Sequence, residues 1–179
     1  MWTQPRRLWP QRASAVIQAD PCGTQRAAFV VRDNFRHRND IERAYLDAIA
    51  HAKTEIVIAS AYFFPGRSFR RALVEAAARG VHVVLLLQGR VEYMLLHYAA
   101  RALYGHLLAS GIEIYEYHRR FLHAKVAVID NQWATVGSSN IDPFSLGMAQ
   151  EANLFADDRA FAAELRSSLR EAIEKRARA

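Results

Sequence analysis

The chain has 179 residues, of which 51% are hydrophobic and 23% are charged, the usage of an ordinary globular protein. A single cysteine, Cys22, excludes an internal disulfide framework and a cysteine-based metal site. The net charge of +6 and the pI near 9.8 favour an anionic partner: phospholipid head groups, an anionic membrane surface or nucleic acid.

The first 24 residues are predicted to form an irregular basic extension, because three prolines and a glycine interrupt them. They lack the continuous apolar core of a signal peptide. Residues 25–179 are predicted to form one domain, which is long enough to bury a proper core. The apolar stretch 91–110 is interrupted by His97, Arg101 and His106, so we expect a helix that does not span a membrane.

Strand and helix patterns alternate along residues 25–179. Asn39 is expected to cap the first helix, with Glu42 at the third position. The predicted strands are 27–31, 54–61, 81–88, 112–117, 121–130, an apolar stretch from Trp133 and a run that begins at Glu151. The predicted helices are one after Asn39 (apolar face Ile41, Tyr45, Ala48, Ile49), 68–79, 91–110 and 158–175. This alternation predicts an α/β fold, a three-layer α-β-α sandwich.

A spaced pattern in the second half of the chain is the strongest functional signal. His123, Lys125 and Asp130 are followed by Gly137-Ser138 and by Asn140. Six fixed residues at fixed offsets arise by chance in about one chain in 10^5 to 10^6 of this length. The pattern therefore indicates a chemical function far more strongly than a lone histidine would.

The residue types in this pattern suit a phosphate group. If 121–130 is a regular strand, His123 and Lys125 share one of its faces. A neutral imidazole can attack phosphorus while Lys125 neutralises the oxygens and Ser138 and Asn140 donate hydrogen bonds to them. Asp130 has the opposite parity and is predicted to be structural, holding its own turn. The alternative, a core histidine beside a snorkelling lysine, leaves the Ser138 and Asn140 spacing unexplained.

Three further residues have a functional and a plain interpretation. Glu151 can accept the second ring N–H of His123 and fix its tautomer, or it is a solvated strand end. Arg119 and Arg120 can hold a phosphate, although a solvated strand end is the favoured interpretation. The seven histidines show no metal-ligand spacing, so we predict no metal and no other cofactor.

These residues are similar to those of the phospholipase D superfamily, in which a histidine breaks and remakes phosphodiester bonds. Residues from about 25 to 175 resemble the C-terminal half of a bacterial cardiolipin synthase of this type. The resemblance is carried by 60–65, 101–105, 111–117, 137–146 and 151–153. It implies a phospholipase D-like fold with a central mixed β-sheet and catalytic functions for His123, Lys125, Asp130, Ser138, Asn140 and Glu151.

The resemblance also implies a reaction, a location and a difficulty. A phosphatidyltransferase of this type acts at the cytoplasmic face of the membrane, as a peripheral protein, on a lipid such as phosphatidylglycerol. Its reaction needs a second histidine that protonates the leaving alcohol, and the family supplies it from a second motif half, whereas this chain has one pattern. A homodimer, a separate complementing half or a catalytically incomplete half-domain are the open alternatives, and a homodimeric phosphodiesterase or nuclease is the runner-up function.

Overall fold

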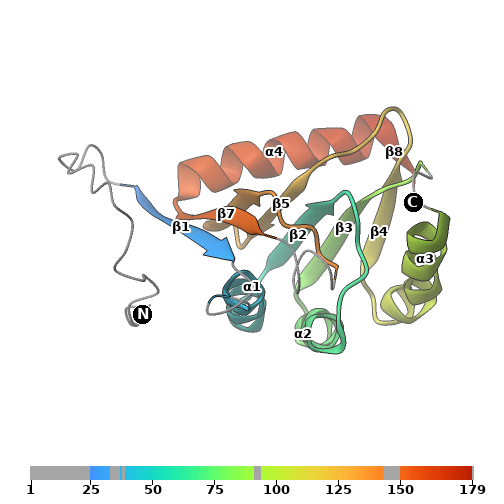
Figure 1. Ribbon diagram of the computed structural model, residues 1–179, viewed down its shortest axis with the longest axis horizontal. Helices are drawn as coiled ribbons and strands as arrows, with labels where there is room; N and C mark the ends of the chain where they lie inside the picture. Colours follow the sequence, from blue (N-terminus) through green and yellow to red (C-terminus); the bar gives the residue numbers. More distant parts are fainter. Residues whose placement is uncertain (1–24, 33–36, 38, 91–93, 143–149, 179) are drawn as a thin grey trace.

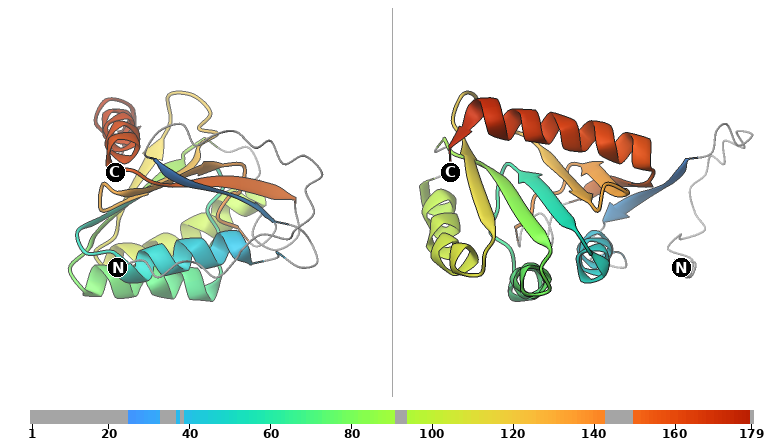
Figure 2. Two further views of the ribbon diagram at one scale, coloured as in Figure 1. Left: turned by 90° about the vertical axis from the view of Figure 1, so that its left-hand side faces the viewer. Right: turned by 180° about the vertical axis from the view of Figure 1, so that it is seen from behind.

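The computed structural model describes residues 25–32, 37, 39–90, 94–142 and 150–178. They form a three-layer α-β-α sandwich around a mixed sheet, which confirms the predicted fold class (Figure 1). Helices α1, α2 and α3 cover one face of the sheet, and α4 crosses the other face alone (Figure 2). The predicted extension 1–24 lies outside the described residues.

The elements follow the predicted order with small differences at their ends. The helices are α1 (Asp40–His51), α2 (Arg67–Ala78), α3 (Met94–Ala109) and α4 (Arg159–Arg176). The strands are β1 (Arg26–Arg32), β2 (Glu55–Ser60), β3 (His82–Gln88), β4 (Glu113–Tyr117), β5 (Lys125–Ile129), β6 (Trp133–Gly137), β7 (Glu151–Asp157) and β8 (Ala177–Arg178). Gly80 and Gly111 follow α2 and α3 with φ of +88° and +80°, the left-handed conformation that ends a helix.

The strand order β1-β7-β6-β5-β2-β3-β4-β8 places the motif strands in the middle of the sheet. Strands β2, β3 and β4 are parallel, and every other pairing is antiparallel. Ser60 at the end of β2 therefore pairs with Lys125 at the start of β5, and Gly137 at the end of β6 pairs with Asn153 near the start of β7. We call this end of the strands the Lys125 end of the sheet. The opposite end of the strands, where Asp130 follows β5, is the Asp130 end.

Side chains alternate between two hydrophobic cores, one on each face of the sheet. On the α1–α3 face, Ile56, Ile58 and Ala127 pack with the helices. On the α4 face, Val57 and Val128 pack against Leu169 and Ile173 of α4, among others. Strand β3 is buried along almost its whole length, as its continuous apolar run predicts for a central strand covered on both faces.

Three details differ from the prediction. The strand predicted at 121–130 is only Lys125–Ile129, because residues 118–124 form a loop from β4 to β5. Asn39 occupies the N-cap position of α1, but its side chain forms no capping hydrogen bond: its ψ of 9° is not the extended conformation that turns a cap side chain toward the first helical N–H groups. Strand β8, two residues paired with β4, had no sequence signal.

Candidate active site

The residues of the spaced pattern, except Asp130, gather at the Lys125 end of the sheet. The antiparallel pairing brings the start of β5 beside the end of β2 and the end of β6. The start of β7 lies beside the end of β6, so Glu151 is at the same end of the sheet. Lys125 on β5, the segment 138–140 after β6 and Glu151 on β7 are therefore held together by the sheet register.

Lys125 is a buried cation at the first position of β5. Its side chain is on the α1–α3 face, the same face as Ala127, and the residue is 7% exposed. The ammonium group donates a hydrogen bond to the backbone carbonyl of His123 at 3.1 Å. A buried ammonium is desolvated and interacts more strongly with a phosphate than an exposed one does, because less water screens it.

His123 lies in the loop before β5 and not on the strand, so the prediction that it shares a strand face with Lys125 was wrong. The histidine is exposed, and within the described residues its imidazole forms no hydrogen bond or ion pair. The two residues are still adjacent, since the Lys125 ammonium binds the His123 carbonyl. The loop position leaves the ring accessible to a group from outside the domain.

Ser138 and Glu151 form a hydrogen-bonded pair beside this loop. The Ser138 hydroxyl donates to the Glu151 carboxylate and accepts a hydrogen bond from the Ala152 N–H at 3.0 Å. The backbone N–H of Ser138 donates to the Ala152 carbonyl at 3.0 Å. Glu151 thus orients a hydroxyl of its own chain, and the expected hydrogen bond from His123 to Glu151 is absent from the described residues.

Asn140 and Ser60 connect the end of β6 to the end of β2. The Asn140 amide oxygen accepts a hydrogen bond from the Tyr62 N–H at 3.4 Å. The Ser60 hydroxyl donates to the Tyr62 carbonyl at 2.7 Å. The residue after Asn140, Ile141, forms a parallel bridge with Phe63. These contacts hold the Asn140 amide oxygen in place beside the end of β2. An amide nitrogen is a hydrogen-bond donor, the kind of group that suits a phosphate oxygen.

Asn153 is a positioning residue that the pattern did not include. It is fully buried; its amide oxygen accepts from the Ser139 N–H at 3.3 Å and its amide nitrogen donates to the Thr135 hydroxyl at 3.1 Å. A Cβ on Gly137 would lie 2.1 Å from that oxygen. Gly137 is therefore glycine because Asn153 fills the space beside it. The signal was available in the sequence, since Asn153 is two residues from Glu151 and shares its strand face.

Asp130 lies at the opposite end of β5, away from the other pattern residues. Asp130 and Asn131, both with φ of 52°, form the hairpin turn to β6. The carboxylate accepts hydrogen bonds from the backbone N–H groups of Lys53, Thr54 and Glu55 at 2.8, 2.8 and 3.0 Å. Burial raises the pKa of this carboxyl, but the hydrogen bonds outweigh burial and hold the pKa below its usual value. Its contacts are structural, and they reach the start of β2 instead of its own turn.

Arg119 and Arg120 lie in the 118–124 loop at the Lys125 end. Both are exposed, and neither forms an ion pair with a described residue. Arg90, which follows β3, reaches the same loop and places its guanidinium 5.3 Å from the centre of the Phe121 ring. The surroundings of His123 are therefore basic.

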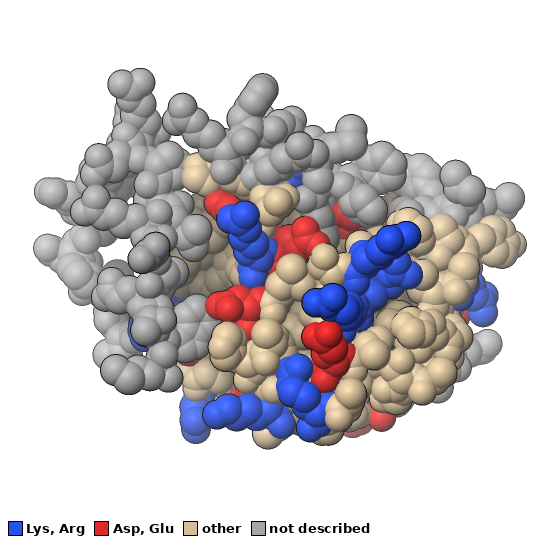
Figure 3. All heavy atoms as spheres, turned by 90° about the horizontal axis from the view of Figure 1, so that it is seen from below, with Lys and Arg blue, Asp and Glu red and all other residues tan. Residues whose placement is uncertain are grey.

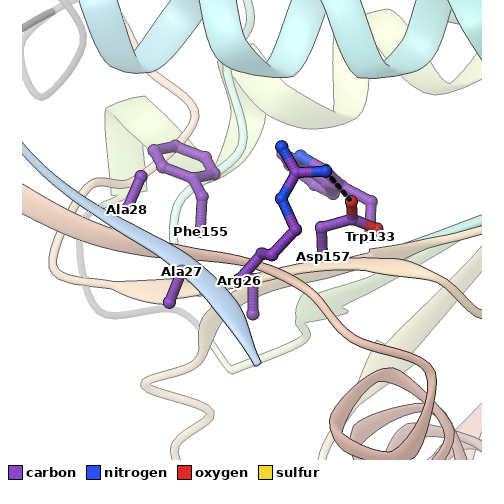
Figure 4. A pocket seen from close by; sticks show the side chains of 7 residues that line it. Arg26, Ala27, Ala28, Trp133, Phe155 and Asp157 are labelled. Carbon is purple, nitrogen blue, oxygen red and sulfur yellow. Dashed lines mark ion pairs between the residues drawn. The ribbon is translucent and has the colours of Figure 1, made fainter. Parts of the chain in front are cut away.

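A separate pocket of about 210 Å³ lies at the Asp130 end. Figure 4 shows the Trp133 and Phe155 rings beside the ion pair between Arg26 and Asp157, which are 3.9 Å apart. The pocket contains no residue of the spaced pattern, so it is not part of the candidate active site. Across the described ranges, no cluster of His, Cys, Asp and Glu has the arrangement of a metal site, and no helix has the length and hydropathy to cross a membrane.

Known proteins match this chain both in sequence and in fold. The family described as "Cardiolipin synthase, PLD-like domain" matches residues 45–173. Cardiolipin synthase B of Salmonella typhi is 49% identical over 164 residues, which are 92% of this chain and 40% of that protein; the Escherichia coli protein of the same name is 46% identical over the same shares. The chain thus spans about 40% of the length of these relatives. The crystal structure of Nuc, a phospholipase D family member from Salmonella typhimurium, has a TM-score of 0.73 at 23% identity and shares the fold over 87% of this chain and 97% of its own.

Proposed function

This chain belongs to the family of cardiolipin synthases with a phospholipase D-like domain, and from that premise we propose that it is a phosphatidyltransferase. It transfers a phosphatidyl group from one phospholipid to the alcohol of another, such as phosphatidylglycerol. The observation that carries the proposal is the meeting of His123 and the buried Lys125 with Ser138 and Asn140 at one end of the sheet.

The reaction divides into two displacements at phosphorus. A neutral imidazole nitrogen of His123 attacks the phosphodiester, and the bond from phosphorus to the leaving alcohol breaks, giving a phosphohistidine. A second imidazole donates a proton to the leaving alkoxide. The acceptor alcohol then gives its proton to that imidazole, attacks phosphorus and breaks the bond from phosphorus to nitrogen. Lys125 neutralises the phosphate oxygens, and the Asn140 amide donates to them. The Ser138 hydroxyl, which donates to Glu151 in this structure, donates to a phosphate oxygen once it rotates away from Glu151.

The second imidazole comes from outside this chain. We propose a homodimer whose twofold axis passes beside the site and brings two copies of His123 to one phosphate. A separate motif half of the same family would supply the same group. The exposed loop position of His123 and its free imidazole support an arrangement of this kind. Glu151 remains the candidate to orient an imidazole, and Arg119 and Arg120 are candidate contacts of the substrate phosphate. We place the enzyme at the cytoplasmic face of the membrane, as a peripheral protein.

A phosphodiesterase or nuclease is the second candidate function. The fold covers 97% of Nuc, so a chain of about this size is found alone in the superfamily. The net charge of +6 also suits a nucleic acid. Incubation with labelled phosphatidylglycerol vesicles and, separately, with plasmid DNA distinguishes the two functions. The proposal requires a diphosphatidyl product and release of glycerol; DNA cleavage without lipid products would replace it with the second candidate.

Mixed dimers test the shared site directly. Wild-type and His123→Ala chains, refolded together in equal amounts, give about a quarter wild-type pairs on random mixing. If one site needs both histidines, activity per total dimer falls to that fraction. A value near one half would mean that each chain works alone, and the shared site would be wrong. Sedimentation of the wild-type protein establishes beforehand whether dimers form.

A further inference from the structure

The loop between β4 and β5 exposes an aromatic side chain beside the candidate active site. Phe121 is 59% exposed, although it lies only two residues before His123. In Figure 2 (left) the loop, in yellow, stands on the same side of the sheet as α4. The neighbours Leu122 and Ala124 pack against the core on that face, so the loop has a fixed base. The packed residues of the loop therefore hold the Phe121 ring exposed to solvent.

Three arginines lie near this ring, one in space and two in sequence. The Arg90 guanidinium lies 5.3 Å from the ring centre, and Arg119 and Arg120 precede the ring in the chain. The carboxylate nearest in sequence, Glu116, contacts His118 at 3.2 Å and Arg101 at 3.8 Å and is largely buried. None of these three arginines forms an ion pair within the described part of the chain.

The outer face of α1–α3 shows a different arrangement. There, basic side chains lie close to acidic ones (Figure 3). On α2, for example, Arg71 and Glu75 form an ion pair at 3.1 Å. A mixed face of this kind has little net attraction for an anionic surface. The loop, by contrast, combines one apolar ring with cations of a single sign.

We propose that this loop is the membrane-docking site of the protein and that its partner is the surface of an anionic phospholipid bilayer. Phe121 enters the boundary between head groups and acyl chains, while Arg90, Arg119 and Arg120 bind head-group phosphates. The inference rests on the proposed function, because a phosphatidyl group must reach His123 from the membrane surface. Docking by Phe121 holds His123, two residues away, at the depth of the lipid phosphates.

Two other partners fit the loop less well. Single-stranded nucleic acid binds aromatic rings by stacking bases on their faces, but Arg90 already covers a face of Phe121. A second protein chain would bury a core depleted of charge, whereas Phe121 is surrounded by cations. The other exposed apolar residues on strands, Phe29, Val31, Val136 and Leu154, lie on β1, β6 and β7, and none of these strands carries Arg90, Arg119 or Arg120.

Vesicle sedimentation with the full chain tests the proposal. The probes are vesicles of phosphatidylcholine alone and vesicles with one third phosphatidylserine, which is not the proposed substrate. Each arginine near an anionic surface is worth ~1 kcal/mol, so Arg90→Gln should weaken partitioning about fivefold. Phe121→Ala should weaken it by about five- to tenfold, and this loss should persist in high salt, which screens only the charges. The matched control is Phe29→Ala, because Phe29 is 51% exposed on β1, away from the loop.

The outcomes separate docking from catalysis. His123→Ala should bind the vesicles as the wild type does while transferring no lipid. A wild-type protein that docks but transfers no lipid contradicts the proposed function and not this inference. Equal vesicle binding by Phe121→Ala, Arg90→Gln and the wild type overturns the inference. So does equal weakening by Phe29→Ala, dissociation of a dimer by Phe121→Ala, or Phe121-dependent binding of a DNA oligonucleotide in place of vesicles.

Discussion

The two ends of the central sheet use the same kinds of polar residue in opposite ways. At the Asp130 end, the Glu55 carboxylate accepts hydrogen bonds from Arg166 and Arg170 of α4, and Asp130 accepts from the chain at 53–55. At the Lys125 end, His123, Arg119 and Arg120 are exposed and form no ion pair with described residues. At the Asp130 end, the charged groups hold the layers together, whereas at the Lys125 end the histidine and the two arginines remain accessible to a ligand.

At the Asp130 end, hydrogen-bonding partners lower the pKa values of two carboxyl groups. Burial raises the pKa of Glu55, but the hydrogen bonds and charges of Arg166 and Arg170 outweigh burial and hold it below its usual value. The pKa of Glu113 is lowered first by the hydrogen bond from His82, whose ring nitrogen lies 2.8 Å from the carboxylate. Both residues are at the Asp130 end. Removing one group at each end separates the structural function from the catalytic one.

His123→Ala should abolish phosphatidyl transfer, with a loss on the order of 10^4-fold or more, because the nucleophile is gone. The free energy of unfolding should stay within about 0.5 kcal/mol of the wild type, since the side chain is exposed and holds no described group. Lipid product analysis and urea denaturation measure the two quantities. A purified variant that still transfers lipid would refute the proposed mechanism.

Glu55→Gln should lower the free energy of unfolding by about 2 to 3 kcal/mol. The substitution leaves Arg166 and Arg170 without their carboxylate, at a cost below that of a fully buried pair because both arginines are partly exposed. The control is Glu75→Gln, which removes the exposed ion pair with Arg71 and should cost less than about 0.5 kcal/mol. Equal costs for the two variants in urea denaturation would show that the Asp130 end has no special part in holding α4.

Gly137→Ala should destabilise the protein by about 2 kcal/mol and also reduce transfer, because the new Cβ would lie 2.1 Å from the Asn153 amide oxygen and 2.5 Å from the Ala152 carbonyl. The turn that carries Ser138 must then move. Gly66→Ala is the control, since no atom lies within 4 Å of its added Cβ. Measured kcat and KM distinguish a displaced site from a merely less stable one. Full activity of the folded Gly137→Ala protein would mean that this turn does not position catalytic groups.

Asp130→Asn should cost about 1 to 2 kcal/mol of stability at neutral pH and leave kcat unchanged, because its contacts are with residues 53–55. The native pKa of Asp130 is lowered, so its contribution is present above the unfolded pKa of about 4 and is lost as pH falls through the native value. The stability of the wild type should therefore decrease below about pH 4, and that of the variant should decrease less. Denaturation at pH 7 and pH 3 checks the sign; an equal decrease would contradict it.

EDTA should leave transfer unchanged, the smallest effect in the series. The candidate site contains an imidazole, an ammonium, a hydroxyl, an amide and one carboxylate, a poor ligand set for a divalent ion. Rates measured with and without chelator, with added Mg²⁺ as the control, test this. Complete loss of activity that a divalent ion restores would place a metal in the reaction.

The sequence predicted the architecture well because the spacing of its apolar residues reflects which side chains are buried. Apolar periodicity identified β2, β3 and α4, and the fixed spacing identified the residues that meet at the Lys125 end. Prediction from the sequence failed where tertiary contacts decide the local structure or the hydrogen-bond partner. Residues 121–124 look like a strand by composition, yet they form a loop because the chain must cross from β4 to β5. The partners of Glu151 and Asp130 depend on strand order, which alternation alone does not give.

The pairing of β1 with β7 has a consequence for how the protein is made. Residue 26 pairs with residue 157, so β1 can join the sheet only after the helices and strands between them have been synthesised. Such a distant contact closes slowly, and until then β1 is an unpaired edge prone to aggregation. Since β7 also carries Glu151 and Asn153, the candidate site is assembled only after β7 has been synthesised. A chain stopped soon after the histidine-lysine pair would carry the motif and yet form no site.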